Sequence, residues 1–112
     1  MEISLYKFEV TVVQFQDRLD ASFVNTVRDT LKELTRAGHD KFVVDLTNVS
    51  FIDSQGLGIL VSLLHAARGN GGTVHIVSSS SEGPQRLFNV TKLDQVFEMF
   101  GTLDTALENF HL

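Results

Sequence analysis

The sequence predicts a small α/β domain built on one sheet in which most strands run parallel. Short apolar runs rich in β-branched residues alternate along the chain with longer segments whose apolar residues recur at helical spacing. This alternation indicates strand–helix–strand units, which build a parallel sheet with right-handed crossovers. The chain has 112 residues, 43% of them hydrophobic, which suffices for one domain with a core and not for two. Residues 1–112 are therefore expected to form a single domain.

The expected order of elements is β-β-α-β-α-β-α-β-α, a mixed sheet of four or five strands with about four helices. Residues 2–6 and 9–15 alternate loosely between apolar and polar side chains, which indicates two short strands. The first of them is expected to pair antiparallel at an edge of the sheet. The link between them, near Lys7 and Phe8, lacks the Asn-Gly or Asp-Gly pair of a tight hairpin.

A loop at Asp17–Asp20 is expected to lead into a helix over residues 22–37. The apolar residues of this segment trace one helical face, and charged residues fill the other. Gly38 supplies the C-terminal stop. Asp20 or Ser22 is the expected N-cap, because their side-chain oxygens can accept from the first free backbone N–H groups.

The centre of the chain holds the stretch around which the rest is organised. Residues 42–46 are apolar and rich in β-branched side chains, which is typical of a buried strand. A polar turn is expected at residues 47–50. An amphipathic helix then begins at Ser54 and runs to about residues 67–68, where the glycine-rich run 69–72 breaks it. Ser54 therefore lies at a helix N-terminus, where unpaired N–H groups and the helix dipole favour negative charge.

The last third of the chain continues the alternation. Residues 73–78 are expected to form a strand, and the serine-rich segment 78–83 a loop. A short helix is expected over residues 84–88, since a proline suits a first helical turn. Residues 96–100 are the candidate for a short edge strand, and the last helix is expected to start at about Thr102.

The composition excludes several classes of function. The formal net charge of −5 makes the chain a poor candidate for binding nucleic acid or an anionic membrane surface, both of which need a basic patch. The absence of cysteine excludes disulfides and thiol catalysis and fits the cytosol. No signal peptide is expected at the N-terminus, and no apolar stretch reaches the roughly 18 residues of a membrane span.

The chain offers little for catalysis. Its histidines are scattered without metal-ligand spacing, so neither a metal nor another cofactor is expected. They are His39, His65, His75 and His111. No Gly-x-Ser-x-Gly elbow surrounds Ser54, and His65 stands about 16 Å further along the same expected helix. We therefore expect a binding module and not an enzyme; a hydrolase that used Ser54 would need a base from another protein.

The stretch Asp53-Ser54-Gln55-Gly56-Leu57-Gly58 resembles the signature of the STAS domains of anti-sigma factor antagonists. That signature is a strand, an acidic residue, a phosphorylatable serine, a variable residue and Gly-Leu-Gly. Similarities elsewhere in the chain are Leu19, Asp20, Gly71, Gly72, Arg86, Leu87 and Phe88. The chain departs from the family at Asp17 and Arg18, where Gly-Glu is usual, and at Gln55, where many members have Ser or Thr. It departs again at Lys92, where the family often has the glycine of a Gly-Leu pair. The resemblance implies a small α/β STAS-like sandwich with the signature helix at one end of the sheet.

The resemblance also implies a bacterial cytoplasmic regulator that works by partner switching. In such a cycle the unphosphorylated protein binds an anti-sigma factor that is also a serine kinase, and so frees the sigma factor. The kinase phosphorylates Ser54, and a serine phosphatase resets the protein. The predicted partner-binding face consists of Asp20, Ser22, Asp53, Ser54, Gln55, Gly56, Gly58 and Ser62. A monomer is the default oligomeric state.

Two alternatives stay open from the sequence. Ser54 can be a plain N-cap, since serine is a preferred residue there; the two roles are compatible, because a phosphate is tolerated at such a position. The alternative function is a non-cycling STAS scaffold, for example a subunit of a stress-signalling complex or of a transporter assembly.

Overall fold

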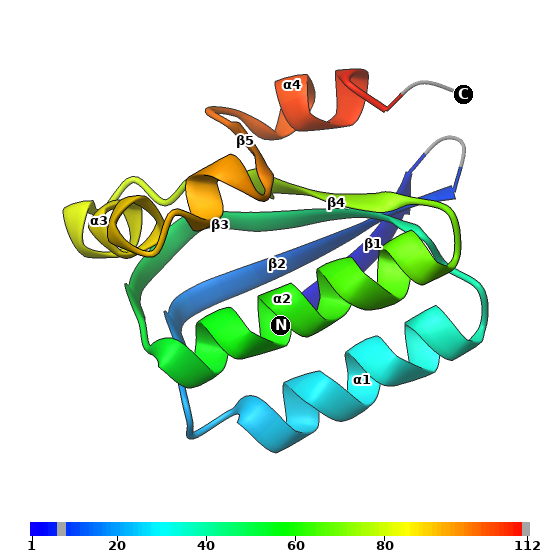
Figure 1. The fold of residues 1–112 in the computed structure, drawn as a ribbon, viewed down its shortest axis with the longest axis horizontal. Coiled ribbons are helices and arrows are strands. Elements are labelled where there is room, and N and C mark those ends of the chain that lie inside the picture. The colour runs from blue at the N-terminus through cyan, green and yellow to red at the C-terminus, as the bar shows by residue number, and fades with distance from the viewer. Residues whose placement is uncertain (7–8, 111–112) are drawn as a thin grey trace.

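The computed structural model describes residues 1–6 and 9–110, which form one five-stranded sheet flanked by helices (Figure 1). The strands are β1 (Glu2–Tyr6), β2 (Val10–Leu19), β3 (Lys41–Ile52), β4 (Thr73–Val77) and β5 (Glu98–Phe100). The helices are α1 (Val24–Arg36), α2 (Ser54–Gly69), α3 (Glu82–Val90) and α4 (Leu103–Glu108), with a 3-10 turn, η2 (Leu93–Gln95). The predicted order of strands and helices is confirmed.

The strands lie in the sheet in the same order as in the sequence, β1-β2-β3-β4-β5. β1 pairs antiparallel with β2 at one edge, and the pairs β2–β3, β3–β4 and β4–β5 are parallel. The predicted mixed, mostly parallel sheet with an antiparallel edge strand is therefore confirmed. Each parallel pair needs a crossover, and α1, α2 and the α3–η2 segment provide them.

The sheet separates two apolar clusters. α1 and α2 lie side by side across one face, and α4 lies on the other, with α3 at the end of the sheet (Figure 1). Successive strand residues point to opposite faces, so Val13 and Val44 join the larger cluster under α1 and α2. Their neighbours Val12 and Val43 join the smaller cluster with Ala106 of α4.

Both central strands are longer than the sequence indicates, so the polar turn predicted at residues 47–50 is wrong. β3 continues to Ile52, and its Val49 is fully buried between exposed polar neighbours. The segment continues as strand because β2 also extends, through two register shifts, until Leu19 lies opposite Ile52. Asp17, predicted in a loop, lies at the second shift with φ 61°, a left-handed conformation that some types of β-bulge contain.

The ends of the helices also differ from the prediction in detail. α1 begins at Val24 after Phe23, and neither Asp20 nor Ser22 is its N-cap. Its C-terminal stop is confirmed, because Gly38 adopts φ 95°. α3 begins at residue 82, before its proline. α4 begins at Leu103, one residue after its predicted start at Thr102, which is its N-cap.

Two further findings bound the described structure. The predicted link near Lys7 and Phe8 lies outside the described residues. No helix within residues 1–6 and 9–110 combines the length and hydropathy that a bilayer crossing requires.

Candidate functional site

The first residues of α2 lie where the parallel strands β2 and β3 end, the edge at which open α/β sheets carry functional loops (Figure 1). Asp53 is the N-cap of α2, and its Oδ1 accepts a hydrogen bond of 2.8 Å from the backbone N–H of Gly56. The interpretation of Ser54 as the N-cap is therefore wrong by one residue. Ser54 is the first helical residue; its side chain is exposed and has no hydrogen-bond partner among the described residues.

Asp53 also holds the loop after β2 against the start of α2. Its second carboxylate oxygen, Oδ2, accepts a hydrogen bond of 3.1 Å from the backbone N–H of Ala21. Its own N–H donates to the carbonyl of Leu19 at 3.3 Å. One side chain thus caps a helix and fixes a neighbouring loop, which brings Asp20 and Ser22 beside Ser54.

Asp20 makes this loop a fixed structure. Its side chain is 7% exposed, accepts from Arg18 Nε at 2.7 Å through Oδ2, and accepts from the backbone N–H of Ser22 at 3.0 Å through Oδ1. The hydrogen bond from Arg18, helped by those from Ser22, lowers the pKa of Asp20 below its ordinary value of 3.8 even though burial opposes the shift. Asp20 is therefore a carboxylate at neutral pH.

Gly56 and Gly58, both predicted to contact a partner, occupy different environments. Gly56 is buried, and a Cβ there would overlap the backbone carbonyl of Leu19, so α2 can pass the end of β2 only with glycine. A Cβ at Gly58 would meet no atom within 4 Å. Gly56 therefore positions the site, whereas Gly58 belongs to its open surface.

The predicted partner-binding residues divide into a foundation and a surface. Asp20 and Gly56 are buried, and Asp53 is half-buried, so these three shape the site from below. The exposed members are Ser22, Ser54, Gln55, Gly58 and Ser62. Contact with a partner is untested for all of them and stays a prediction.

Two exposed aromatic residues beside the site were not singled out from the sequence as candidates for it. Phe23 and Phe51 are 49% and 44% exposed, and the guanidinium of Arg18 lies 4.8 Å from the centre of the Phe51 ring. Phe51 reaches the surface because β3 continues to Ile52. The sequence signal was weak, since an apolar residue between a strand and a helix ordinarily indicates the core.

The remaining candidate groups have structural partners. His75 is 2% exposed; its Nδ1 lies 2.8 Å from the carbonyl oxygen of Ala106, and its Nε2 lies 3.0 Å from Glu98 Oε2. The Phe110 ring stacks on it with centroids 3.8 Å apart. Asp45 accepts hydrogen bonds from neighbouring side chains. Within the part of the chain that the structure describes, no three His, Cys, Asp or Glu residues could together hold a metal ion.

Comparison with known proteins places this geometry in a family. The STAS domain family model matches residues 6–106. A candidate anti-sigma factor antagonist of Thermotoga neapolitana is 33% identical over 68% of this chain and 66% of its own length. The anti-sigma-B factor antagonist of Staphylococcus epidermidis is 32% identical over 78% of this chain and 80% of its own. The chain thus spans slightly less than two thirds of the Thermotoga relative.

Solved structures show the same fold. The crystal structure of a candidate anti-sigma factor antagonist from Thermotoga maritima superposes with a TM-score of 0.87 at 24% identity, over 96% of this chain and 91% of the other. The Bacillus cell fate determinant SpoIIAA in its phosphorylated form superposes with a TM-score of 0.76 at 18% identity, again over 96% of this chain and of the other. The chain therefore belongs to the STAS domain family of anti-sigma factor antagonists.

Proposed function

We propose that this chain is a partner-switching regulator whose binding to its partner is controlled by phosphorylation of Ser54. In the unphosphorylated form it binds an anti-sigma factor that is also a serine kinase and so releases the sigma factor. Phosphorylation of Ser54 ends that binding, and a serine phosphatase restores it. The proposal places the protein in the cytoplasm, where sigma factors work, and makes it a binding module and not an enzyme.

The observation that carries the proposal is the environment of the Ser54 hydroxyl. Asp53 fulfils the capping role, so the Ser54 side chain is exposed and free of intramolecular hydrogen bonds in the described structure. A kinase can therefore reach it without unfolding the helix. A relative of the same fold has been solved in both unphosphorylated and phosphorylated forms.

The fold can tolerate the phosphate. A phosphoserine adds a charge of about −1.5 to −2, and at the first position of a helix it meets free backbone N–H groups and the positive end of the helix dipole. The adjacent carboxylate of Asp53 already accepts hydrogen bonds from the N–H groups of Gly56 and Ala21, and no acidic side chain follows it in the first turn of α2. A favourable term of roughly 0.3–1 kcal/mol is typical at an exposed helix N-terminus, so stability should change little.

A bound partner cannot tolerate the phosphate in the same way. The flanking surface is exposed and partly apolar, with Phe23 and Phe51 as the large side chains. Burying an unmatched dianion against a surface shaped for a neutral hydroxyl costs several kcal/mol, and each 1.4 kcal/mol is tenfold in affinity. The carboxylates of Asp53 and Asp20 belong to the same site, so a phosphate on Ser54 would increase the negative charge that a partner surface has to match.

The test is affinity capture from the lysate of the native host with four baits. They are the wild type, Ser54→Ala, Ser54→Asp, and a matched charge control, Asn89→Asp, at an exposed position of α3. We expect all baits except Ser54→Asp to capture one ATP-binding serine kinase, and part of the wild-type bait to carry phosphate on Ser54. If all four baits capture the same partners and Ser54 is never modified, the protein is a non-cycling STAS scaffold instead.

A further inference from the structure

A groove of about 270 Å³ runs between α1 and α2 on the surface that faces away from the sheet. Its floor consists of apolar atoms of Leu31, Ile59 and Leu63. Thr35, Ser62 and Ala66 complete its walls, and Arg28 and Lys32 of α1 form its rim.

The rim is basic although the protein is acidic. The chain carries a formal net charge of −5, yet none of the described residues that line the groove is acidic. Arg28 and Lys32 are exposed, and the ion pairs found among residues 1–6 and 9–110 involve neither of them. Two unpaired cations over an apolar floor match an occupant that combines carboxylates with an apolar side chain.

We propose that this groove is the docking site for an acidic amphipathic helix of a partner protein. Apolar side chains of such a helix would rest on Leu31, Ile59 and Leu63, and its carboxylates would meet Arg28 and Lys32. Two parallel helices with a trough between them are a common receptor for a third helix, whose anchors recur at i, i+3 and i+4.

The groove is continuous with the Ser54 surface, and this part of the inference rests on the proposed function. Ile59 lies five residues after Ser54 on the same helix, a rise of roughly 7 Å, and Ser62 lies one turn further. Only the end of an acidic segment that lies over Ile59 would thus come within a Debye length, about 8 Å at physiological ionic strength, of a phosphate on Ser54, because Ser62 and Ala66 lie roughly 12 and 18 Å further along α2 from Ser54. The phosphate would repel this segment through space as well as blocking contact.

The test titrates the isotope-labelled full chain with a synthetic amphipathic helical peptide that presents leucine on one face and glutamate on the other. The charge control is the same peptide with lysine in place of glutamate. We expect the acidic peptide to shift the backbone amides of Thr35, Ser62 and Ala66, and the basic peptide to leave them unchanged. The double variant Arg28→Glu/Lys32→Glu should weaken binding at least about tenfold, a change of 1.4 kcal/mol.

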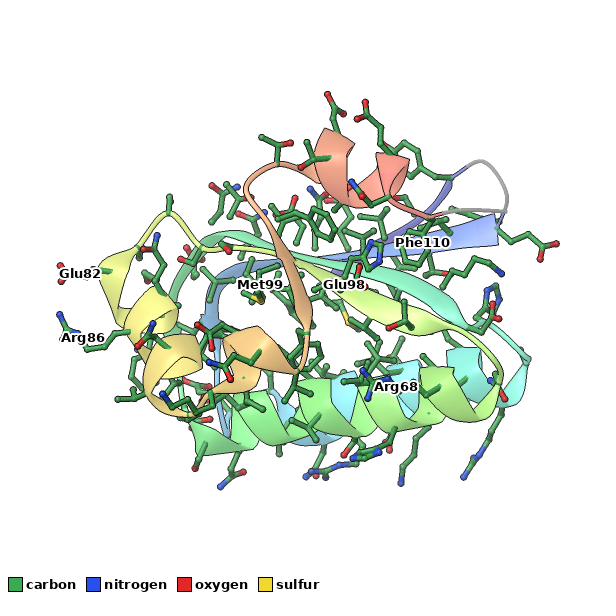
Figure 2. All side chains as sticks on the ribbon, turned by 45° about the horizontal axis from the view of Figure 1, so that its top comes forward. Arg68, Glu82, Arg86, Glu98, Met99 and Phe110 are labelled. Atoms are coloured by element: carbon green, nitrogen blue, oxygen red, sulfur yellow. The ribbon has the colours of Figure 1, made fainter. Side chains whose placement is uncertain are left out.

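Arg86→Glu/Lys41→Glu is the matched control, because it changes the net charge equally at positions outside the groove lining. Arg86 projects from α3 beside Glu82, with which it pairs at 2.7 Å (Figure 2). This control should bind the acidic peptide with nearly wild-type affinity. Equal loss in both double variants would mean that only net charge matters and would overturn the proposal.

Two further outcomes would also overturn it. Both peptides could bind equally, or inorganic phosphate alone could reproduce the amide shifts while the acidic peptide produces none; the groove would then be an anion site and not a helix receptor. None of these readouts uses a kinase or the state of Ser54. Failure of the proposed function, seen as an unmodified Ser54 and no captured kinase, is therefore distinguishable from failure of the groove.

Discussion

The start of α2 and the surroundings of His75 are both rich in polar groups. Around His75 these groups are paired and covered by other side chains, whereas at the start of α2 one of them is exposed to solvent. Both ring nitrogens of His75 face acceptors, and aromatic rings from β5 and the segment after α4 cover it. Figure 2 shows Glu98 and Phe110, two of these neighbours, on the α4 side of the sheet. At α2 the polar groups beneath the surface are equally well paired, but the Ser54 hydroxyl above them is free.

The contrast between the two regions separates stability from recognition in this fold. In the closed region every polar group is used to hold β4, β5 and α4 together, so changes there should affect unfolding. In the open region Asp20, Asp53 and Gly56 form the rigid foundation, and exposed residues above them are left for a partner. Variants can therefore be sorted by which of the two quantities they change.

The largest effect is expected at Gly56, in the foundation of the open region. Gly56→Ala would place a methyl group onto the backbone carbonyl of Leu19, and neither α2 nor the end of β2 can move away without losing hydrogen bonds. Overpacking of this kind costs about 1–3 kcal/mol, and more when the obstacle is backbone. Urea unfolding followed by circular dichroism measures it; an unfolding free energy within about 0.5 kcal/mol of wild type would contradict the packing argument.

The next largest effect is expected at His75. His75→Phe keeps an aromatic ring between Phe100 and Phe110 but leaves the buried carbonyl of Ala106 without its partner. An unsatisfied buried acceptor costs about 1–3 kcal/mol. The control is His65→Phe, at an exposed position of α2. We expect only the first variant to lower the unfolding free energy and neither to change affinity for the captured kinase. Loss of kinase binding by a fully folded His75→Phe variant would contradict the assignment of His75 to the closed, structural region.

A substitution of Phe51, in the open region, should change partner affinity more than stability. Phe51→Ala removes an exposed ring that contacts Arg18, so stability should fall by less than about 1 kcal/mol. Affinity for the partner should fall about tenfold or more, as for an aromatic anchor at an interface. Val90→Ala, an exposed apolar residue on α3, is the control and should change neither quantity. Calorimetric titration with the captured kinase separates the two.

The order of the helices and strands was predictable from local sequence patterns, but the length of one strand was not. Helical and strand periodicity, with Gly38 as a stop and Thr102 at the start of α4, suffices for the order of elements. The length of β3 was not predictable, since the polar residues 47–50 favour a turn locally and only pairing with an equally extended β2 keeps them in the strand. Here tertiary pairing overrides local propensity.

The sequence predicted where in the chain the candidate site lies, but not the structural role of each of its residues. Asp53 and Ser54 are equally good N-caps by residue type, so sequence could not decide which one caps and which one is free. Gly56 and Gly58 are likewise identical as residues, and only the approach of Leu19 distinguishes them. The exposure of Phe51 was not predictable either, because burial of a side chain depends on the whole fold.

Gly58→Ala should have a smaller effect, and of opposite sign on stability. Alanine in a helix interior is more favourable than glycine by about 0.8–1 kcal/mol, and the added methyl group meets open space. If Gly58 belongs to the docking surface, the same methyl group should weaken binding to the captured kinase. If Gly58→Ala is more stable than wild type and binds the kinase with unchanged affinity, Gly58 does not contact the partner.

The smallest effect is expected from Asp20, and it is lost in acid. Its pKa is lower in the folded chain than in the unfolded one, chiefly because Arg18 donates to it, so it stabilises the fold above the unfolded-state pKa. That stabilisation is lost as the pH falls through the folded-state pKa. We expect the advantage of wild type over Asp20→Asn in urea unfolding to be constant above about pH 5 and to shrink below about pH 4. An advantage independent of pH would mean that Asp20 acts by hydrogen-bond geometry alone, and the loop beside Ser54 would then owe nothing to the charge of its carboxylate.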